Sequence, residues 1–187
     1  SIQLKMNHPL FSKRLQFRLI NLSDVENIHA LHSLPETDEF NALGVPENLE
    51  ETNAIVGPWI LENKKRHIIN YTFAIEGKIN QDFIGLFGFK LGAEKYKRAE
   101  VWFKIHSDHW NKGYATEALK TIIDFGFQTL HLHRIQAGCA VHNLGSINVL
   151  EKAGMTQEGR GRQVLPLKSG WSDNFEYSIL ETDIFSV

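Results

Sequence analysis

Hydrophobic and polar positions along the first third of the chain predict one strand and two helices. Residues 14–20 alternate polar and apolar side chains, which is typical of a strand with one buried face. The next segment predicts a helix that begins with a capping box of Ser23 and Glu26 and ends at Pro35. Its buried face is expected to carry Val25, Ile28, Leu31 and His32.

The next segments predict a second helix and then three strands. After an irregular polar stretch, residues 36–46, the helix is expected to run from residue 48 to about residue 65, with an interruption near Gly57 and Pro58. Three consecutive apolar runs then predict strands at residues 71–75, 83–91 and 99–105. Residues 77–81 are expected to form the turn of a hairpin between the first two strands.

The second half of the chain carries the clearest helical pattern. Residues 114–130 place their apolar side chains on one side and their charged side chains on the other. A strand at residues 134–140 and a short helix at residues 143–153, ended by Gly154, are expected to follow. Two strands are expected at the end, at residues 157–165 and 174–180. The turn between them contains Pro166, Ser169 and Gly170.

This order of elements predicts a single domain of the α/β (α+β) class that comprises residues 1–187. Three successive strands without a helix between them imply an antiparallel meander. We therefore expect a mixed sheet rather than a doubly wound parallel sheet. A chain of this length can bury a substantial core. The sequence contains no internal repeat, linker or low-complexity segment.

Composition limits the classes of function. Hydrophobic residues make up 42% and charged residues 22% of the chain, and the formal net charge is −2. The chain therefore has no overall positive field for nucleic acid, and its basic runs at residues 64–66 and 95–98 are interpreted as solvated turns or helix ends. No apolar run is long enough for a membrane span, and residues 1–8 have no signal-peptide core. Because Cys139 is the single cysteine, no internal disulfide can form, and we expect a cytoplasmic protein without a membrane partner.

One segment, residues 109–119, predicts a binding site. It follows an expected strand, contains a single glycine, Gly113, and continues into the amphipathic helix. Gly113 permits a positive φ or a close backbone approach. The first N–H groups of a helix have no partner within it and carry the positive end of its dipole, so this helix start suits an anion such as a pyrophosphate. The segment is not a P-loop, because Lys112 precedes its glycine.

The run Trp110-Asn111-Lys112-Gly113-Tyr114-Ala115 resembles the acetyl-CoA-binding motif of the GNAT N-acetyltransferases, whose usual form is Gln/Arg-x-x-Gly-x-Gly/Ala. Further segments, in the expected order, resemble the Rim-type branch, which is named for the enzymes that acetylate the N-termini of ribosomal proteins. These segments are residues 98–102, 113–119, 133–137, 143–155, 158–160, 171–173 and 177–180. The resemblance covers residues 14–181 and implies a GNAT fold, with a mixed, mostly antiparallel sheet of about seven strands flanked by four helices.

Three positions depart from the pattern of the family. Trp110 stands where Gln or Arg is usual, and we expect its side chain to pack beside the loop while backbone amides hold the phosphates. Met155 replaces a usual Phe, which is an exchange that a core tolerates. Leu165 lies in a segment where some Rim-type enzymes carry a carboxylate proposed as general base, so the identity of the base in this chain stays open.

The resemblance implies acetyl-CoA as cosubstrate and assigns its binding residues by position. The backbone amides expected to hold the pyrophosphate are those of Asn111, Lys112, Gly113, Tyr114, Ala115 and Thr116. The strand residues expected to offer backbone groups to pantetheine and to the thioester carbonyl are Trp102, Phe103, Lys104 and Ile105. Asn143 is expected to bond the pantetheine arm, and Ser146 to donate to the CoA sulfur. The same residues also fit ordinary roles in a core strand, a helix N-cap and a first helical turn.

Glu100 is the first candidate for the general base that takes the proton of the acceptor ammonium, directly or through water. Its neighbours Val101 and Trp102 would partly desolvate the carboxylate and raise its pKa. An ion pair between Glu100 and a Lys or Arg of a neighbouring strand is an equal alternative. Asp173 and His109 are further candidates for amine binding or proton relay.

The nine histidines do not form a metal motif. They include the pairs His29 and His32, His106 and His109, and His131 and His133, without a third ligand at a suitable spacing. We therefore expect no metal cofactor and interpret these histidines as surface or core residues. Cys139 lies in an apolar strand and is expected to be a small buried residue rather than a nucleophile.

The sequence thus predicts an enzyme that transfers the acetyl group of acetyl-CoA to a primary amine. By resemblance, the expected acceptor is a protein N-terminal α-amine of the ribosomal-protein type. A small amine, such as a polyamine, an antibiotic or an amino acid, is the first alternative, and a non-catalytic acyl-CoA-binding module is the second. The sequence does not decide between a monomer and a homodimer.

Overall fold

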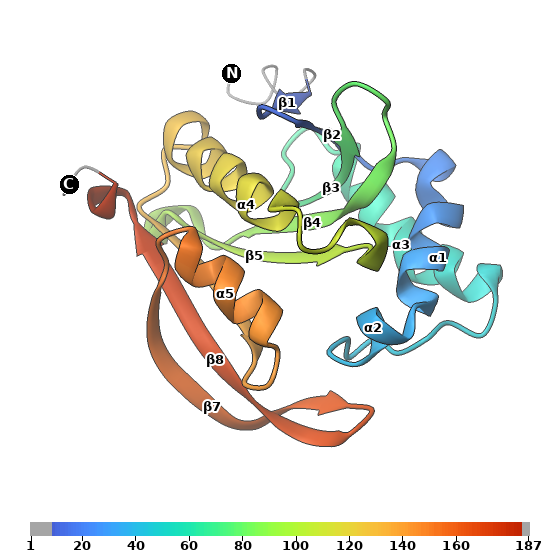
Figure 1. The fold of residues 1–187 in the computed structure, drawn as a ribbon. Coiled ribbons are helices and arrows are strands. Elements are labelled where there is room, and N and C mark those ends of the chain that lie inside the picture. The colour runs from blue at the N-terminus through green and yellow to red at the C-terminus, as the bar shows by residue number, and fades with distance from the viewer. Residues whose placement is uncertain (1–8, 185–187) are drawn as a thin grey trace.

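The structure is a computed structural model that describes residues 9–184. Its centre is one eight-stranded sheet with the strand order β1-β2-β3-β4-β5-β6-β8-β7 (Figure 1). All neighbouring strands pair antiparallel except β5 and β6, which pair parallel. The mixed sheet and the meander predicted from the sequence are therefore confirmed, with slightly more strands than expected.

Apart from β1 and α2, which were not predicted, the elements follow the order predicted from the hydrophobic pattern. The strands are β1 Leu10–Phe11, β2 Leu15–Leu19, β3 Asn70–Gly77, β4 Phe83–Leu91, β5 Arg98–Ile105, β6 Arg134–Ala140, β7 Thr156–Leu167 and β8 Gly170–Leu180. The helices are α1 Val25–Ser33, α2 Pro35–Asp38, α3 Leu49–Asn63, α4 Tyr114–Asp124 and α5 Leu144–Lys152. Helix α4 continues into a π-helical turn, Phe125–Thr129. The shorter 3-10 segments are Leu22–Asp24, Glu94–Tyr96, Ser107–His109 and Glu181–Asp183.

Helices cover both faces of the sheet and bury two hydrophobic cores. Helices α4 and α5 cover one face, where Leu119 and Leu150 are fully or almost fully buried (Figure 1). Helices α1 and α3 cover the other face, where Ile28 is buried in a second cluster. Because strand side chains alternate between the faces, β5 contributes Val101 to the first core and packs Trp102 against the second. The face of α1 that was predicted to be buried is buried as expected.

The predicted cap of the first helix was wrong, and so was the prediction that residues 36–46 are irregular throughout, because α2 occupies Pro35–Asp38. Asn21, not Ser23, is the N-terminal cap: its side chain accepts the N–H of Ser23 at 2.9 Å, and Asp24 rather than Glu26 completes the capping box. This box begins a short 3-10 turn ahead of α1, because Asn and Asp accept backbone N–H groups readily at such starts. Pro35 lies just after the end of α1, as expected, but it also begins α2, since a proline at the first helical position loses no hydrogen bond.

The predicted interruption of the second helix was also wrong. Helix α3 runs continuously through Gly57 and Pro58. The lost N–H of Pro58 is offset by packing, because Val56 and Ile60 on either side of it are buried in the second core. The closing strands are longer than predicted, since β7 and β8 pair as far as Leu167 and Gly170.

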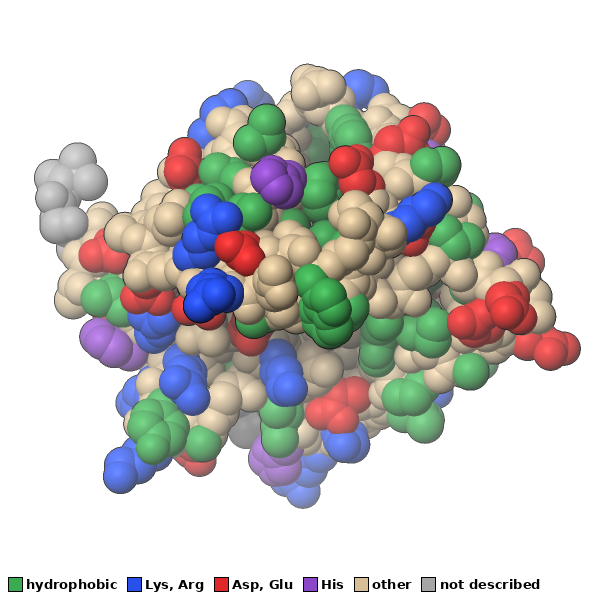
Figure 2. Space-filling view, turned by 90° about the horizontal axis from the view of Figure 1, so that it is seen from below, with side chains coloured by type: hydrophobic (Ala, Val, Ile, Leu, Met, Phe, Trp, Pro, Cys, Tyr) green, Lys and Arg blue, Asp and Glu red, His purple; other side chains and the backbone are tan. Residues whose placement is uncertain are grey.

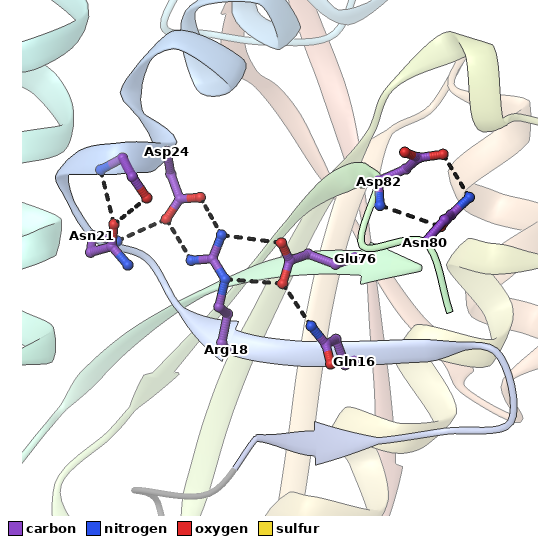
Figure 3. A network of polar contacts seen from close by, with 8 residues as sticks. Gln16, Arg18, Asn21, Asp24, Glu76, Asn80 and Asp82 are labelled. Carbon is purple, nitrogen blue, oxygen red and sulfur yellow. Dashed lines mark hydrogen bonds and ion pairs between the residues drawn. The ribbon is translucent and has the colours of Figure 1, made fainter. Parts of the chain in front are cut away.

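A buried ion-pair network ties the start of α1 to the sheet (Figure 3). The guanidinium of Arg18 on β2 donates to both carboxylate oxygens of Asp24, at 2.7 and 2.6 Å, and its Nε donates to Glu76 on β3 at 3.0 Å. Asp24 also accepts the N–H of Asn21 at 2.8 Å and is only 1% exposed. The paired carboxylates raise the pKa of Arg18, with Asp24 the largest cause. Removing one member would therefore leave a partly buried charge without its partner.

We expect Asp24→Ala to lower the free energy of unfolding by about 3 kcal/mol, because the Arg18 pair and the capping-box hydrogen bond from the N–H of Asn21 are both lost. The matched control is Glu181→Ala, since Glu181 pairs with His133 on the surface, and this change should cost well under about 1 kcal/mol. Urea unfolding of both variants measures the difference. Equal losses would contradict the role assigned to the network.

Candidate active site

Strands β5 and β6 pair over a short stretch and then separate. Their register runs from Arg98 opposite Arg134 to Val101 opposite Ala137. Beyond that point β5 stays paired with β4 as far as Ile105, while β6 stays paired with β8 to its end. The sheet therefore opens into a wedge beyond Val101. Its edges are residues 102–105 of β5 and 138–140 of β6.

Phe103 presents its backbone N–H and C=O to this wedge. Backbone groups of a strand point alternately to its two edges. The carbonyl of Lys97 accepts the N–H of Arg134 at the start of β6 (3.1 Å), whereas the carbonyl of Arg98 accepts the N–H of Gly92 at the end of β4 (2.9 Å). Odd-numbered residues of β5 therefore face β6. At Phe103 the β6 strand has already turned away.

Trp110 closes the far end of the wedge. Its indole N–H donates to the carbonyl of Ile105 at 2.7 Å. Ile105 is the next residue after Phe103 whose backbone faces away from β4. The indole thus supplies the donor that a neighbouring strand would otherwise provide, and it attaches the loop to the end of β5. The side chain lies beside the loop, as the sequence predicted.

Helix α4 begins without a side-chain cap. Gly113 is its N-cap with φ of 78°, and Asn111 has φ of 60°. The N–H of Glu117 makes the first helical bond, to the carbonyl of Gly113 at 3.1 Å. The preceding amides of Tyr114, Ala115 and Thr116 have no acceptor within the helix. Free N–H groups and the helix dipole make this start a binding site for an anion.

The N-terminal strands hold this loop in position. The Arg14 guanidinium donates to the carbonyl of Lys112 at 2.9 Å and to the carboxylate of Glu117 at 2.7 Å, and it lies 4.4 Å from the ring centre of Tyr114. The Ser12 hydroxyl donates to the same carboxylate. Burial opposes ionisation of Glu117, but the hydrogen bonds from Ser12 and Arg14 outweigh it and lower the pKa of the carboxyl. The one acidic side chain in the first turn of α4 is therefore already paired.

One cleft of about 910 Å³ joins the wedge to the start of α4. The cofactor residues predicted from the sequence all line it except Lys112, whose carbonyl is held by Arg14. On the β6 side the cleft is bordered by Asn143 and Ser146. The side-chain oxygen of Asn143 accepts the N–H of Ser146 at 3.2 Å, which makes Asn143 the N-cap of α5.

The opposite wall of the cleft carries a cluster that the sequence reasoning missed. The Lys104 ammonium lies 3.0 Å from Nε2 of His32 on α1 and 5.1 Å from the ring centre of Trp102. Trp59 of α3 packs on Trp102, with ring centres 5.7 Å apart. Gly88 on β4 makes room for the Trp102 indole, because an added Cβ would lie 1.9 Å from its Nε1. Alternation along β5 could have placed Lys104 beside Trp102, but the sequence alone could not supply the partners from α1 and α3.

Burial changes both titrating groups of this cluster. Burial lowers the pKa of Lys104 to about 8. Burial, followed by the nearby charge of Lys104, lowers the pKa of His32 to about 3. His32 is therefore neutral at physiological pH, and its Nε2 accepts a hydrogen bond from the Lys104 ammonium.

Comparison with known proteins identifies the family. Residues 14–156 match the acetyltransferase (GNAT) domain. The chain belongs to the GNAT acetyltransferase family. Over 173 residues it is 32% identical to the uncharacterized N-acetyltransferase YoaA of Bacillus subtilis, an alignment that covers 92% of this chain and 96% of that protein. The protein is therefore an acetyl-CoA-dependent N-acetyltransferase, as the sequence predicted.

Solved structures confirm the GNAT fold. The spermidine N-acetyltransferase of Vibrio cholerae in complex with CoA and spermine has a TM-score of 0.81 and 22% identity, over 94% of this chain and 100% of that one. The ribosomal-protein-S5-alanine acetyltransferase of Vibrio fischeri has a TM-score of 0.79 and 22% identity, over 94% of this chain and 98% of that one. At this identity the two likenesses establish the fold and leave the acceptor open.

Glu100 does not reach the cleft of this acetyltransferase. It is exposed near the start of β5, where Lys90 and Gln136 flank it on the neighbouring strands. The expected desolvation was wrong, because Val101 points to the opposite face and the strand is still paired on both edges at Glu100. The wedge opens beyond Val101, after Glu100.

The two further candidates for amine binding differ in position. His109 lines the cleft, whereas Asp173 lies outside its lining. Asp173 accepts the backbone N–H of Gln163 at 2.8 Å and pairs with Arg160 at 2.7 Å, and these two contacts lower the pKa of its carboxyl. Asp173 is therefore committed to the β7–β8 hairpin.

The structure also describes the surroundings of Cys139 and of the histidines. Cys139 is buried, as predicted, and burial raises the pKa of its thiol to about 11, so the group is a poor nucleophile at neutral pH. Between residues 9 and 184, no three His, Cys, Asp or Glu side chains are grouped as they would be around a metal ion. Within the same residues, no helix is long and apolar enough to cross a membrane.

We expect Trp110→Phe to weaken CoA binding severalfold and to lower the free energy of unfolding by about 1 kcal/mol, because the carbonyl of Ile105 loses its donor. The control is Trp171→Phe, since Trp171 is 66% exposed on the β7–β8 hairpin. Isothermal titration with CoA and urea unfolding give the two quantities. Unchanged CoA affinity in Trp110→Phe would contradict the role given to the indole.

Proposed function

We propose that the cleft binds acetyl-CoA with its pyrophosphate on the start of α4 and its pantetheine arm in the wedge between β5 and β6. The observation that carries this proposal is one cleft that contains both an uncapped helix N-terminus and the unpaired strand edge at Phe103. The amides of Gly113, Tyr114, Ala115 and Thr116, together with Asn111, would hold the phosphates. When bound, acetyl-CoA supplies an acetyl group activated as a thioester.

Phe103 and Ser146 are the proposed residues next to the reacting atoms. The backbone N–H of Phe103 faces the wedge and would stabilise negative charge on the thioester oxygen. The backbone contacts expected of Trp102 and Lys104 are corrected by the strand register, because their backbone groups are directed to β4. These two residues would contribute side chains instead. The half-buried hydroxyl of Ser146 would donate to the departing sulfur, and Asn143 would contact the pantetheine arm.

Two lysines extend the proposed phosphate site. A small hollow beside the cleft is lined by Gly113, Thr116 and Glu117 together with Lys120 of α4 and Lys152 of α5. Glu117 is already paired with Arg14, so the two ammonium groups give the hollow a positive charge. This charge complements the phosphates of CoA and supports the orientation proposed above.

The proposed acceptor is a primary amine, and a protein N-terminal α-amine of the ribosomal-protein type is the first candidate. It would enter from the side of α1–α3, opposite α4 and α5. In Figure 2, which views the molecule from below, Lys and Arg side chains spread over the left and lower parts, and Asp and Glu side chains gather at the right-hand edge, on the side of α1 and α3 in Figure 1.

Glu100 is exposed and lies outside the cleft. As a general base it would therefore take the proton of the acceptor through water rather than directly.

We expect CoA to raise the midpoint of thermal unfolding, and Lys152→Met to weaken CoA binding about fivefold while leaving pantetheine binding unchanged, because pantetheine lacks the phosphates. Lys95→Met is the control, since Lys95 is exposed on the turn before β5. Thermal shift and isothermal titration provide the measurements. Absence of any CoA-dependent shift in the wild type would overturn the proposed site.

Release of free thiol from acetyl-CoA identifies the acceptor. We expect release in the presence of at least one peptide with a free N-terminal α-amine and no release with the same peptide after N-terminal blocking. A Ser146→Ala variant should bind CoA normally and turn over more slowly. Release with spermidine alone would contradict an α-amine acceptor.

A further inference from the structure

Lys104 brings a half-buried positive charge to the proposed acceptor side of the cleft without a carboxylate to neutralise it. Among the ion pairs formed by residues 9–184, none includes Lys104. Its polar contact is the neutral ring of His32, which accepts one hydrogen and supplies no charge. With a pKa near 8, the amine is mostly protonated at neutral pH. An anion that enters the cleft would offset the partial desolvation of this ammonium.

Asn41 gives a second and independent sign of a missing partner. It is 8% exposed, lies after α2 and lines the same cleft. Its side-chain oxygen accepts the N–H of Leu43 at 3.3 Å, which fixes the orientation of the amide. The Nδ2 group is buried without a hydrogen-bond acceptor, and within residues 9–184 it is the sole buried side-chain polar atom in this condition. A buried donor left unsatisfied is costly, so its retention at a cleft wall points to an acceptor on a ligand.

The surroundings of Lys104 strengthen its attraction for an anion. Trp59 and Trp102 line the cleft beside it, and their apolar rings lower the local dielectric. The acidic side chains that line the same cleft, Glu36 and Glu39, are exposed on or next to α2. They are suited to a cationic group at the rim rather than to pairing with Lys104.

We propose that Lys104 and Asn41 form a carboxylate subsite for the acetyl acceptor. The acceptor would then be a primary amine that also carries a carboxylate, such as a free amino acid or a peptide whose first residue is acidic. This inference rests on the proposed acetyl-CoA site, because Phe103 and Lys104 are consecutive residues of β5 and contact opposite sides of the cleft. The backbone of Phe103 faces the wedge, and the side chain of Lys104 faces the acceptor. A polyamine has only positive charges, and Lys104 would repel it.

Matched pairs of ligands test this subsite. The probes are amino acids and their C-terminal amides, and peptide amides that begin with Asp or Glu and their Asn or Gln counterparts. Binding is measured by thermal shift with CoA present, and turnover by thiol release. We expect at least one carboxylate member to bind about tenfold more tightly than its amide partner. The two kinds of pair distinguish a free amino acid from a peptide.

Two substitutions remove the subsite and one leaves it intact. Lys104→Met and the isosteric Asn41→Asp should abolish the preference for the carboxylate, mainly through KM, while CoA still stabilises both variants. Lys90→Met removes an exposed lysine of β4 and should keep the preference. The unchanged CoA shift serves as the test that the variants are folded.

Three results would overturn the subsite. Equal binding of carboxylates and amides by the wild type is one, and efficient acetylation of spermidine without any carboxylate binding is another. The third is a fall in kcat in Lys104→Met that is equal for both members of each pair, since that result would make Lys104 a proton acceptor. A wild type that gives no shift with CoA would instead overturn the proposed acetyl-CoA site.

Discussion

The separation of β5 from β6 beyond Val101 is the constraint on which the site depends. A strand that keeps one partner and loses the other leaves backbone N–H and C=O groups on its free edge, and such groups need partners. At the end of β5, the carbonyl of Ile105 also faces this free edge, and it accepts a hydrogen bond from the indole N–H of Trp110. Phe103 is the position where the edge stays open toward the cleft. The loop that Trp110 attaches then leads directly into the uncapped start of α4, so strand edge and anion site face the same space.

The alternation of side chains along β5 divides the cleft into two functional sides. Val101 packs under α4 and α5, where the proposed acetyl-CoA site lies, and Trp102 and Lys104 pack toward α1 and α3. The two sides are stabilised by different interactions. Arg14 positions the loop through Glu117 and the carbonyl of Lys112, whereas the Arg18 network anchors the start of α1, whose last turn carries His32 (Figure 3). The proposed acetyl-donor and acceptor sites thus depend on separate attachments to the same sheet.

Most of the fold could be predicted from hydrophobic periodicity, and the uncapped helix start that lines the cleft from the sequence around Gly113. Both predictions depend on features of short segments: the spacing of apolar side chains and the free backbone N–H groups at a helix start. Glu100 could not be placed in the same way, because its exposure depends on where β6 leaves β5, a property of two distant segments. The uninterrupted helix at Pro58 depends on burial in the second core. The cluster of Lys104, His32 and Trp59 joins three elements whose contacts no local pattern contains.

Amide hydrogen exchange followed by NMR tests the central claim, that CoA occupies the open edge of β5 and the start of α4. On addition of saturating CoA, we expect slower exchange at the amides of Phe103, Tyr114, Ala115 and Thr116. The amide of Val101, which faces β6 where the two strands still pair, should not change. Slowed exchange confined to other parts of the chain, with Phe103 and the start of α4 unaffected, would contradict the claim.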